Sequence, residues 1–148
     1  MHTLTALAIR NFRSCESVTL DLAPYTPFVG YNNAGKSNIL SAIRWLVAPF
    51  ALTPADYLQA DRPIQVDGTI TGITPALLAR LEPRHRSKVQ PFVSGETIQI
   101  RREQTQPGTP KTSTLYVFDP SQPADPWRIN PAGIPEALKA LFPEPIVI

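Results

Sequence analysis

The chain has 148 residues, 43% of them hydrophobic, and a formal charge of +2 from 14 basic and 12 acidic residues. This length supports one domain with a hydrophobic core, and the balanced charge gives no argument for nucleic-acid binding by itself. A single cysteine, Cys15, excludes an internal disulfide framework, and no apolar run is long enough to span a bilayer. The first residues lack the features of a signal peptide, so we expect a cytoplasmic location.

The first third of the chain predicts regular elements. Residues 3–10 alternate loosely between apolar and polar and predict a strand, which a turn at residues 11–14 connects to a second strand at residues 18–22. A short apolar strand at residues 26–29 ends at a glycine. From Lys36 onward the apolar residues recur at helical spacing, which predicts a helix that ends before Pro49.

The rest of the chain holds 15 of the 17 prolines and predicts an irregular region of short elements. Thr74 and Pro75 have the residue types of a helix cap and a first helical position. The Gln-Pro-Gly-Thr-Pro sequence at residues 106–110 favours a hairpin turn. The predicted elements are a strand at residues 64–70, a helix at 76–81, hairpin strands at 97–101 and 113–118, a helix at 135–142 and a strand at 146–148.

The motif that carries chemistry lies between the third strand and the first helix. Residues 30–37 read Gly-Tyr-Asn-Asn-Ala-Gly-Lys-Ser, a complete G-x-x-x-x-G-K-[ST] phosphate loop. Gly30 permits a sharp exit from the strand, and Gly35 lets the backbone approach the phosphates closely. Backbone N–H groups and the start of the helix attract the phosphates. Lys36 then reaches the β- and γ-phosphates and the Ser37 hydroxyl binds Mg²⁺, so the motif predicts a nucleotide site with Mg²⁺. The motif alone does not distinguish kinases, GTPases and ATPases.

The residues around this loop resemble a known family. Leu7 to Ser14, followed by a strand and then by Phe28 to Ile43, resembles the N-terminal lobe of RecF/SMC-like ABC ATPases. Within that group the sequence is most similar to the overcoming-lysogenization-defect nucleases and to AAA-type DNA-repair and phage-defence ATPases. The resemblance is strong over residues 4–47 and weak afterwards. Asn33 stands where SMC-type loops commonly have glycine, a replacement found in the defence-type branch, and Cys15 replaces a usual aromatic residue.

The resemblance implies a fold and a set of nucleotide contacts. The fold class is α/β with mixed α+β character: the N-terminal half of an ABC-type ATPase head, with a mixed sheet around the phosphate-loop helix and an irregular second half. Residues 1–148 form one partial domain, divided into a phosphate-loop core at 1–48 and a strand, hairpin and short-helix region at 49–148. Arg13 lies near the phosphates, as do Asn32 and Asn38, although a solvated arginine and plain helix capping are the alternatives. The implied cofactor-binding set is Arg13, Gly30, Asn32, Asn33, Ala34, Gly35, Lys36, Ser37 and Asn38, with Lys36 catalytic and Ser37 the metal ligand.

Hydrolysis in this family requires a second lobe with a signature motif, a strand that ends in Asp-Glu and a switch histidine. Asp119 follows the apolar residues 115–118, but Pro120 comes next and no glutamate follows. We therefore expect an ATP-binding lobe that is incomplete for hydrolysis and that dimerises through ATP with the missing lobe or with a full-length ATPase; DNA would be bound by the assembled complex. The alternative is a non-catalytic regulator or decoy of such an ATPase. A small phosphate-loop kinase is disfavoured by the Asn-Phe-Arg-Ser element.

Two further features have ordinary structural interpretations. Trp45 falls on the helix that follows the phosphate loop, and we expect it in the core rather than under an adenine ring. We interpret a basic cluster at residues 80–88 as a solvated face, because no aromatic residues are interleaved with it. The alternative is a surface for nucleic acid or a partner.

Overall fold

The computed structural model describes residues 2–22 and 33–142 of the chain. The strands predicted at residues 26–29 and 146–148 lie outside these residues. The described strands are β1 (Thr3–Phe12), β2 (Cys15–Asp21), β3 (Ile64–Thr71), β4 (Thr97–Gln104), β5 (Thr114–Phe118) and β6 (Trp127–Ile129). The described helices are α1 (Asn33–Val47), α2 (Pro75–Arg80), α3 (Pro83–Val89) and α4 (Ile134–Leu141).

The six described strands form one sheet in the order β2-β1-β3-β4-β5-β6. All five pairings between them are antiparallel, so the described part of the expected mixed sheet is antiparallel throughout. The predicted hairpin of β4 and β5 is confirmed, with Ile100 opposite Val117. The fold class is a mixed α/β arrangement, as expected. The second half of the chain is more regular than its proline content suggested, because four of its segments extend the sheet begun by β1 and β2.

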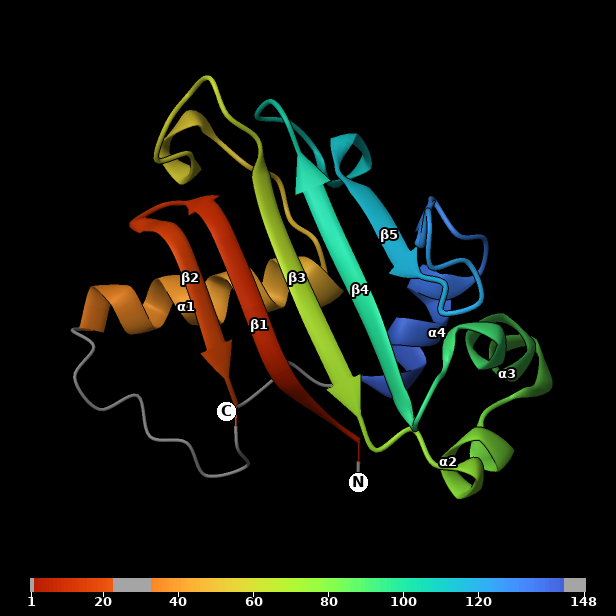
Figure 1. The fold of residues 1–148 in the computed structure, drawn as a ribbon. Helices are drawn as coiled ribbons and strands as arrows, with labels where there is room; N and C mark the ends of the chain where they lie inside the picture. The colour runs from red at the N-terminus through yellow and green to blue at the C-terminus, as the bar shows by residue number, and fades with distance from the viewer. Residues whose placement is uncertain (1, 23–32, 143–148) are drawn as a thin grey trace.

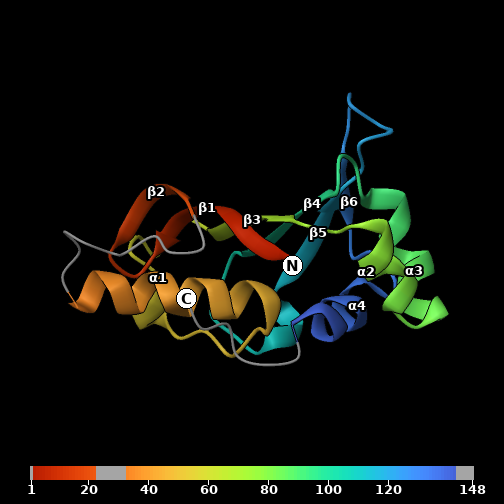
Figure 2. The same cartoon turned by 90° about the horizontal axis from the view of Figure 1, so that it is seen from below.

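The helices α1 and α4 lie on the same side of the sheet, as the view in Figure 2 shows. Helix α1 crosses behind β2, β1 and β3 (Figure 1) and buries an apolar stripe at helical spacing. The stripe consists of Ile39, Ala42, Ile43 and Leu46, all at most 1% exposed. Burial of each large aliphatic side chain of this kind stabilises the fold by about 1.5–3 kcal/mol. The core therefore lies between α1, α4 and the inner face of the sheet.

Proline begins helices in the second half of the chain instead of breaking them. Each of α2, α3 and α4 has a proline at its first or second position. So do the three 3-10 turns at Pro54–Asp56, Gln90–Phe92 and Pro110–Thr112. A proline fits there because the first N–H groups of a helix have no partner within the helix. The predicted cap of α2 is confirmed, since the Thr74 hydroxyl accepts a hydrogen bond of 3.1 Å from the Leu77 N–H.

The close approach of α1 to the sheet depends on a glycine in β3. A Cβ atom at Gly68 would lie 2.6 Å from Leu46 Cδ2 and 3.0 Å from Leu4 Cδ1. Such contacts are far inside van der Waals distance, so a larger residue at this position must push the Leu46 and Leu4 side chains out of their places between α1 and the sheet.

Replacing Gly68 with valine is therefore expected to lower the free energy of unfolding by about 1–3 kcal/mol, a typical cost of overpacking a core. Urea denaturation followed by circular dichroism measures the change. Thr69→Val is the matched control, since it places a branched side chain on the opposite face of β3. Equal stability of Gly68→Val and the wild type would contradict the tight packing of α1.

Candidate functional site

The candidate site is the beginning of helix α1, which carries the end of the phosphate-loop motif. Gly30 and Asn32 lie outside the described residues, and Asn33, Ala34 and Gly35 form the first residues of the helix. Lys36 and Ser37 are exposed in its first turns, and no acidic residue lies in the first turn. A helix start that presents an ammonium group and a hydroxyl to solvent without a nearby helical carboxylate is suited to binding an anion.

The turn between β1 and β2 holds this end of the helix in place. Asn38 donates a hydrogen bond of 2.7 Å from Nδ2 to the Ser14 hydroxyl. Its Oδ1 atom lies 3.5 Å from Arg13 Nη1. The structure thus brings two of the predicted residues, Arg13 and Asn38, together, and Asn38 lies two residues beyond Lys36 on the helix. Each is tied to a neighbouring side chain, and their contact with phosphate stays a prediction.

Arg13 is also bound to a segment more than 40 residues further along the chain. Its Nε lies 2.9 Å from Asp56 Oδ1, and its backbone N–H donates to the Asp56 carbonyl at 2.7 Å. Asp56 is 8% exposed and also accepts hydrogen bonds from the backbone N–H and the hydroxyl of Thr53. The carboxylate therefore fixes the Arg13 guanidinium beside α1, while the Arg13 side chain remains 32% exposed.

Asn11 organises the same turn on its other side. Asn11 and Arg13 both have positive φ, 61° and 54°, which asparagine tolerates better than most residues. The buried Asn11 amide donates to the carbonyls of Gln59 and Arg62 at 3.0 and 2.7 Å, and its oxygen accepts from the Gln59 N–H at 2.7 Å. The turn is consequently shorter than predicted: β1 continues to Phe12 and only Arg13 and Ser14 remain outside the strands.

Sequence reasoning did not identify Asn11 or Asp56 as part of this arrangement. The Thr53-Pro-Ala-Asp56 sequence has the spacing of a capping box, which would have pointed to a fixed turn there. The partnership with Arg13 had no comparable signal, because it joins residues 43 positions apart.

The other residues that the sequence analysis singled out lie away from the beginning of α1. Trp45 is fully buried in the core, as expected. Asp119 closes the turn after β5, where it accepts hydrogen bonds from the backbone N–H and the hydroxyl of Ser121, and these bonds lower its pKa. Its Oδ2 lies 3.9 Å from Arg128 Nε. Asp119 is thus engaged within its own turn, and the basic cluster at residues 80–88 falls on α2 and α3.

The described part of the chain contains no dense cluster of metal-ligating side chains. Among residues 2–22 and 33–142, no group of three or more His, Cys, Asp or Glu side chains is placed to hold a metal ion. The exposed Ser37 hydroxyl fits the usual protein contribution to Mg²⁺ in phosphate-loop sites, where the ion keeps several waters and binds substrate phosphates. No helix in the described part of the chain has the length and apolar character needed to cross a membrane.

Comparisons with known proteins support the ATPase resemblance of the sequence around this site. Residues 3–71 match the AAA ATPase domain family, a range that includes β1, β2, α1 and β3. The chain is 40% identical over 148 residues to the Old nuclease of Escherichia phage P2. The aligned region covers 98% of this chain and 24% of that protein. The chain therefore spans about a quarter of the length of the curated relative that it matches.

Replacing Asp56 with alanine tests the contact that fixes Arg13. The change removes the ion pair and both hydrogen bonds to Thr53, so we expect the free energy of unfolding to fall by about 2–3 kcal/mol. Thermal unfolding measures the loss. Asp61→Ala is the matched control because Asp61 is an exposed aspartate on the same segment. Similar stability of the two variants would show that Asp56 does not hold this turn.

Proposed function

The chain is an AAA ATPase lobe of the Old-nuclease type, and from this premise we propose that it binds Mg-ATP at the start of α1. The observation that carries the proposal is the exposed Lys36–Ser37 pair in the first turns of a helix whose other face is buried. The similarity to a nuclease supports a role in DNA repair, DNA processing or phage defence, and we place the protein in the cytoplasm.

The residues of the site have separate tasks in this proposal. The Lys36 ammonium group binds the β- and γ-phosphates, and the N–H groups at the start of α1 add their partial positive charge. The Ser37 hydroxyl holds Mg²⁺, which neutralises charge on the phosphate oxygens when bound. Arg13 remains paired with Asp56, so only its outer N–H groups would turn toward a phosphate. Asn38 positions Arg13 and the β1–β2 turn relative to the helix.

We further propose that this lobe needs a partner for hydrolysis. The 148 residues contain no apolar run that ends in paired carboxylates, and Asp119 is engaged in its own turn. A lobe that carries the signature motif, in the same polypeptide or in a second copy of such an ATPase, would supply the missing groups across the bound ATP. A purely regulatory role is less well supported, because a regulator has no need of the intact Lys36–Ser37 pair.

Replacing Lys36 with alanine is expected to weaken ATP binding by about 30- to 150-fold, since loss of a charge-assisted contact costs on the order of 2–3 kcal/mol. Isothermal titration calorimetry with Mg-ATP measures the affinity. Lys111→Ala, at an exposed lysine in the second half of the chain, is the control and should bind like the wild type. Equal affinity of Lys36→Ala and wild type would rule out the proposed site.

The isolated 148-residue chain is expected to show no steady-state ATP hydrolysis. In-line attack requires a group that positions water, and the sequence supplies none at a recognisable place. A phosphate-release assay tests this, with Lys36→Ala as the background for contaminating activity. A turnover of about 1 s⁻¹, ordinary for phosphoryl transfer, that disappears in Lys36→Ala would contradict the partner requirement.

A further inference from the structure

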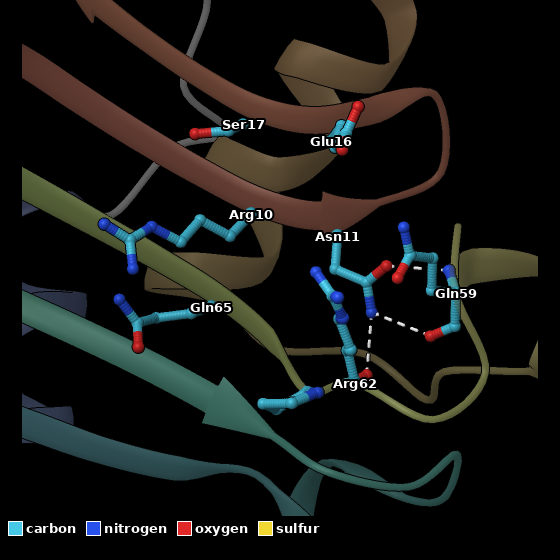
Figure 3. A pocket seen from close by; sticks show the side chains of 8 residues that line it. Arg10, Asn11, Glu16, Ser17, Gln59, Arg62 and Gln65 are labelled. Atoms are coloured by element: carbon cyan, nitrogen blue, oxygen red, sulfur yellow. Dashed lines mark hydrogen bonds between the residues drawn. The ribbon is translucent and has the colours of Figure 1, made fainter.

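The outer face of the sheet carries a hollow on the side opposite to helix α1, away from the proposed ATP site. It has a volume of about 320 Å³, near the lower end for small-molecule sites. Figure 3 shows it at the end of the sheet beside the β1–β2 turn. Its lining residues are Arg10, Asn11, Glu16, Ser17, Gln59, Arg62, Pro63 and Gln65.

The hollow is separated from the nucleotide site by the sheet itself. Side chains alternate between the two faces of a strand, and Ile9 and Val66 are fully buried on the face that α1 covers. Arg10 and Gln65, their chain neighbours, therefore point to the opposite face. These two residues lie opposite each other in the β1–β3 pairing, and Ser17 lies opposite Arg10 in β2. The three side chains thus form a row across adjacent strands.

The charge of the hollow favours an anion. Neither Arg10 nor Arg62 forms an ion pair with a carboxylate of the described residues, and both side chains are exposed. Ser17, Gln59 and Gln65 add neutral hydrogen-bond donors. Glu16 is the single carboxylate in the lining. Two unpaired guanidinium groups with nearby amide and hydroxyl donors match the oxygen atoms of a phosphate group, which arginine can bind in a bidentate manner.

Part of the hollow is fixed before any ligand binds. The buried Asn11 side chain holds the backbone of Gln59 and Arg62 with three hydrogen bonds of 2.7–3.0 Å. In Figure 3 the Arg62 side chain lies beside Asn11, and Arg10 and Gln65 extend in the same direction across the sheet. A preformed backbone reduces the conformational entropy that binding must otherwise remove.

We propose that this hollow is a second phosphate-binding site, which takes a phosphate group through Arg10, Arg62 and Gln65. The phosphate belongs either to a nucleic-acid backbone or to a small free anion, since both offer the same oxygen atoms. The site lies on the sheet face away from α1, so it does not rest on the proposed ATP binding.

The first experiment titrates inorganic phosphate, at constant ionic strength, into the ¹⁵N-labelled chain carrying Lys36→Ala, which removes competition from the phosphate loop. We expect saturable shifts of the Arg10 and Arg62 Nε–H and Gln65 amide signals. In a chain that carries Arg10→Gln and Arg62→Gln in addition to Lys36→Ala, only the Gln65 amide signal remains, and its saturable shift should disappear. The matched control is Arg80→Gln with Arg84→Gln, which removes the same charge from exposed arginines of the basic cluster and should leave the shifts unchanged.

The second experiment distinguishes the source of the phosphate. Anisotropy of a labelled single-stranded oligonucleotide is measured with the two double arginine variants, each with Lys36 intact. A loss of oligonucleotide affinity of about tenfold or more in Arg10→Gln/Arg62→Gln, without such a loss in the control variant, assigns the site to nucleic acid. The expected size follows because each charge-assisted contact contributes about a tenfold factor in affinity. Unchanged oligonucleotide affinity together with saturable phosphate shifts assigns it to a small anion.

Two results would overturn the proposal. One is the absence of saturable phosphate shifts at Arg10, Arg62 and Gln65 together with equal oligonucleotide affinity in all proteins. The other is an equal loss in both double arginine variants, which indicates only an effect of net charge. If ATP does not bind at α1, the proposal for the hollow can still be tested, because the phosphate titration is made in the Lys36→Ala chain.

Discussion

The packing of helix α1 against the sheet is the constraint on which the rest of the structure depends. The helix must bury one face completely and yet present its first turns to solvent. Its buried stripe from Ile39 to Leu46 meets β1 and β3, where Gly68 leaves room for Leu46. Lys36 and Ser37 lie just before this stripe and remain exposed. The position of the helix start, where we propose that phosphate binds, is therefore set by apolar contacts that extend over the following turns.

The opposite end of α1 is held by a buried cation. Arg102 projects from β4 into the core, donates from Nε to the Leu46 carbonyl at 3.1 Å and from Nη1 to the Ser113 hydroxyl at 2.9 Å. Burial lowers the pKa of Arg102 to about 10, so the guanidinium remains charged at neutral pH. It also lies 6.0 Å from the centre of the Trp45 ring. A positive charge at the C-terminal end of a helix interacts favourably with the helix dipole, which repays part of the cost of burying it.

The sequence was most informative where a local pattern determines local structure. The alternation in β1 and β3, the helical spacing after Lys36 and the Thr74 cap all depend on neighbours a few residues away, and the structure confirms them. Helix α3 and strand β6 were missed, since α3 is rich in charged residues and β6 has only three residues. The Arg13–Asp56 pair and the Asn11 contacts join residues 43 to 51 positions apart. Such contacts follow from the order of strands in the sheet, which no local pattern encodes.

The segment from Thr53 to Arg62 links the two faces of the sheet at the β1–β2 turn. Its first part supplies Asp56 to Arg13, on the side where α1 begins. Its last part supplies Gln59 and Arg62 to the hollow on the outer face, through backbone contacts with Asn11. Asn11 and Arg13 are separated by one residue and both have positive φ, so the turn sends one side chain to each region. Movement of this segment would alter both the setting of Arg13 and the shape of the hollow, because the same short turn anchors them.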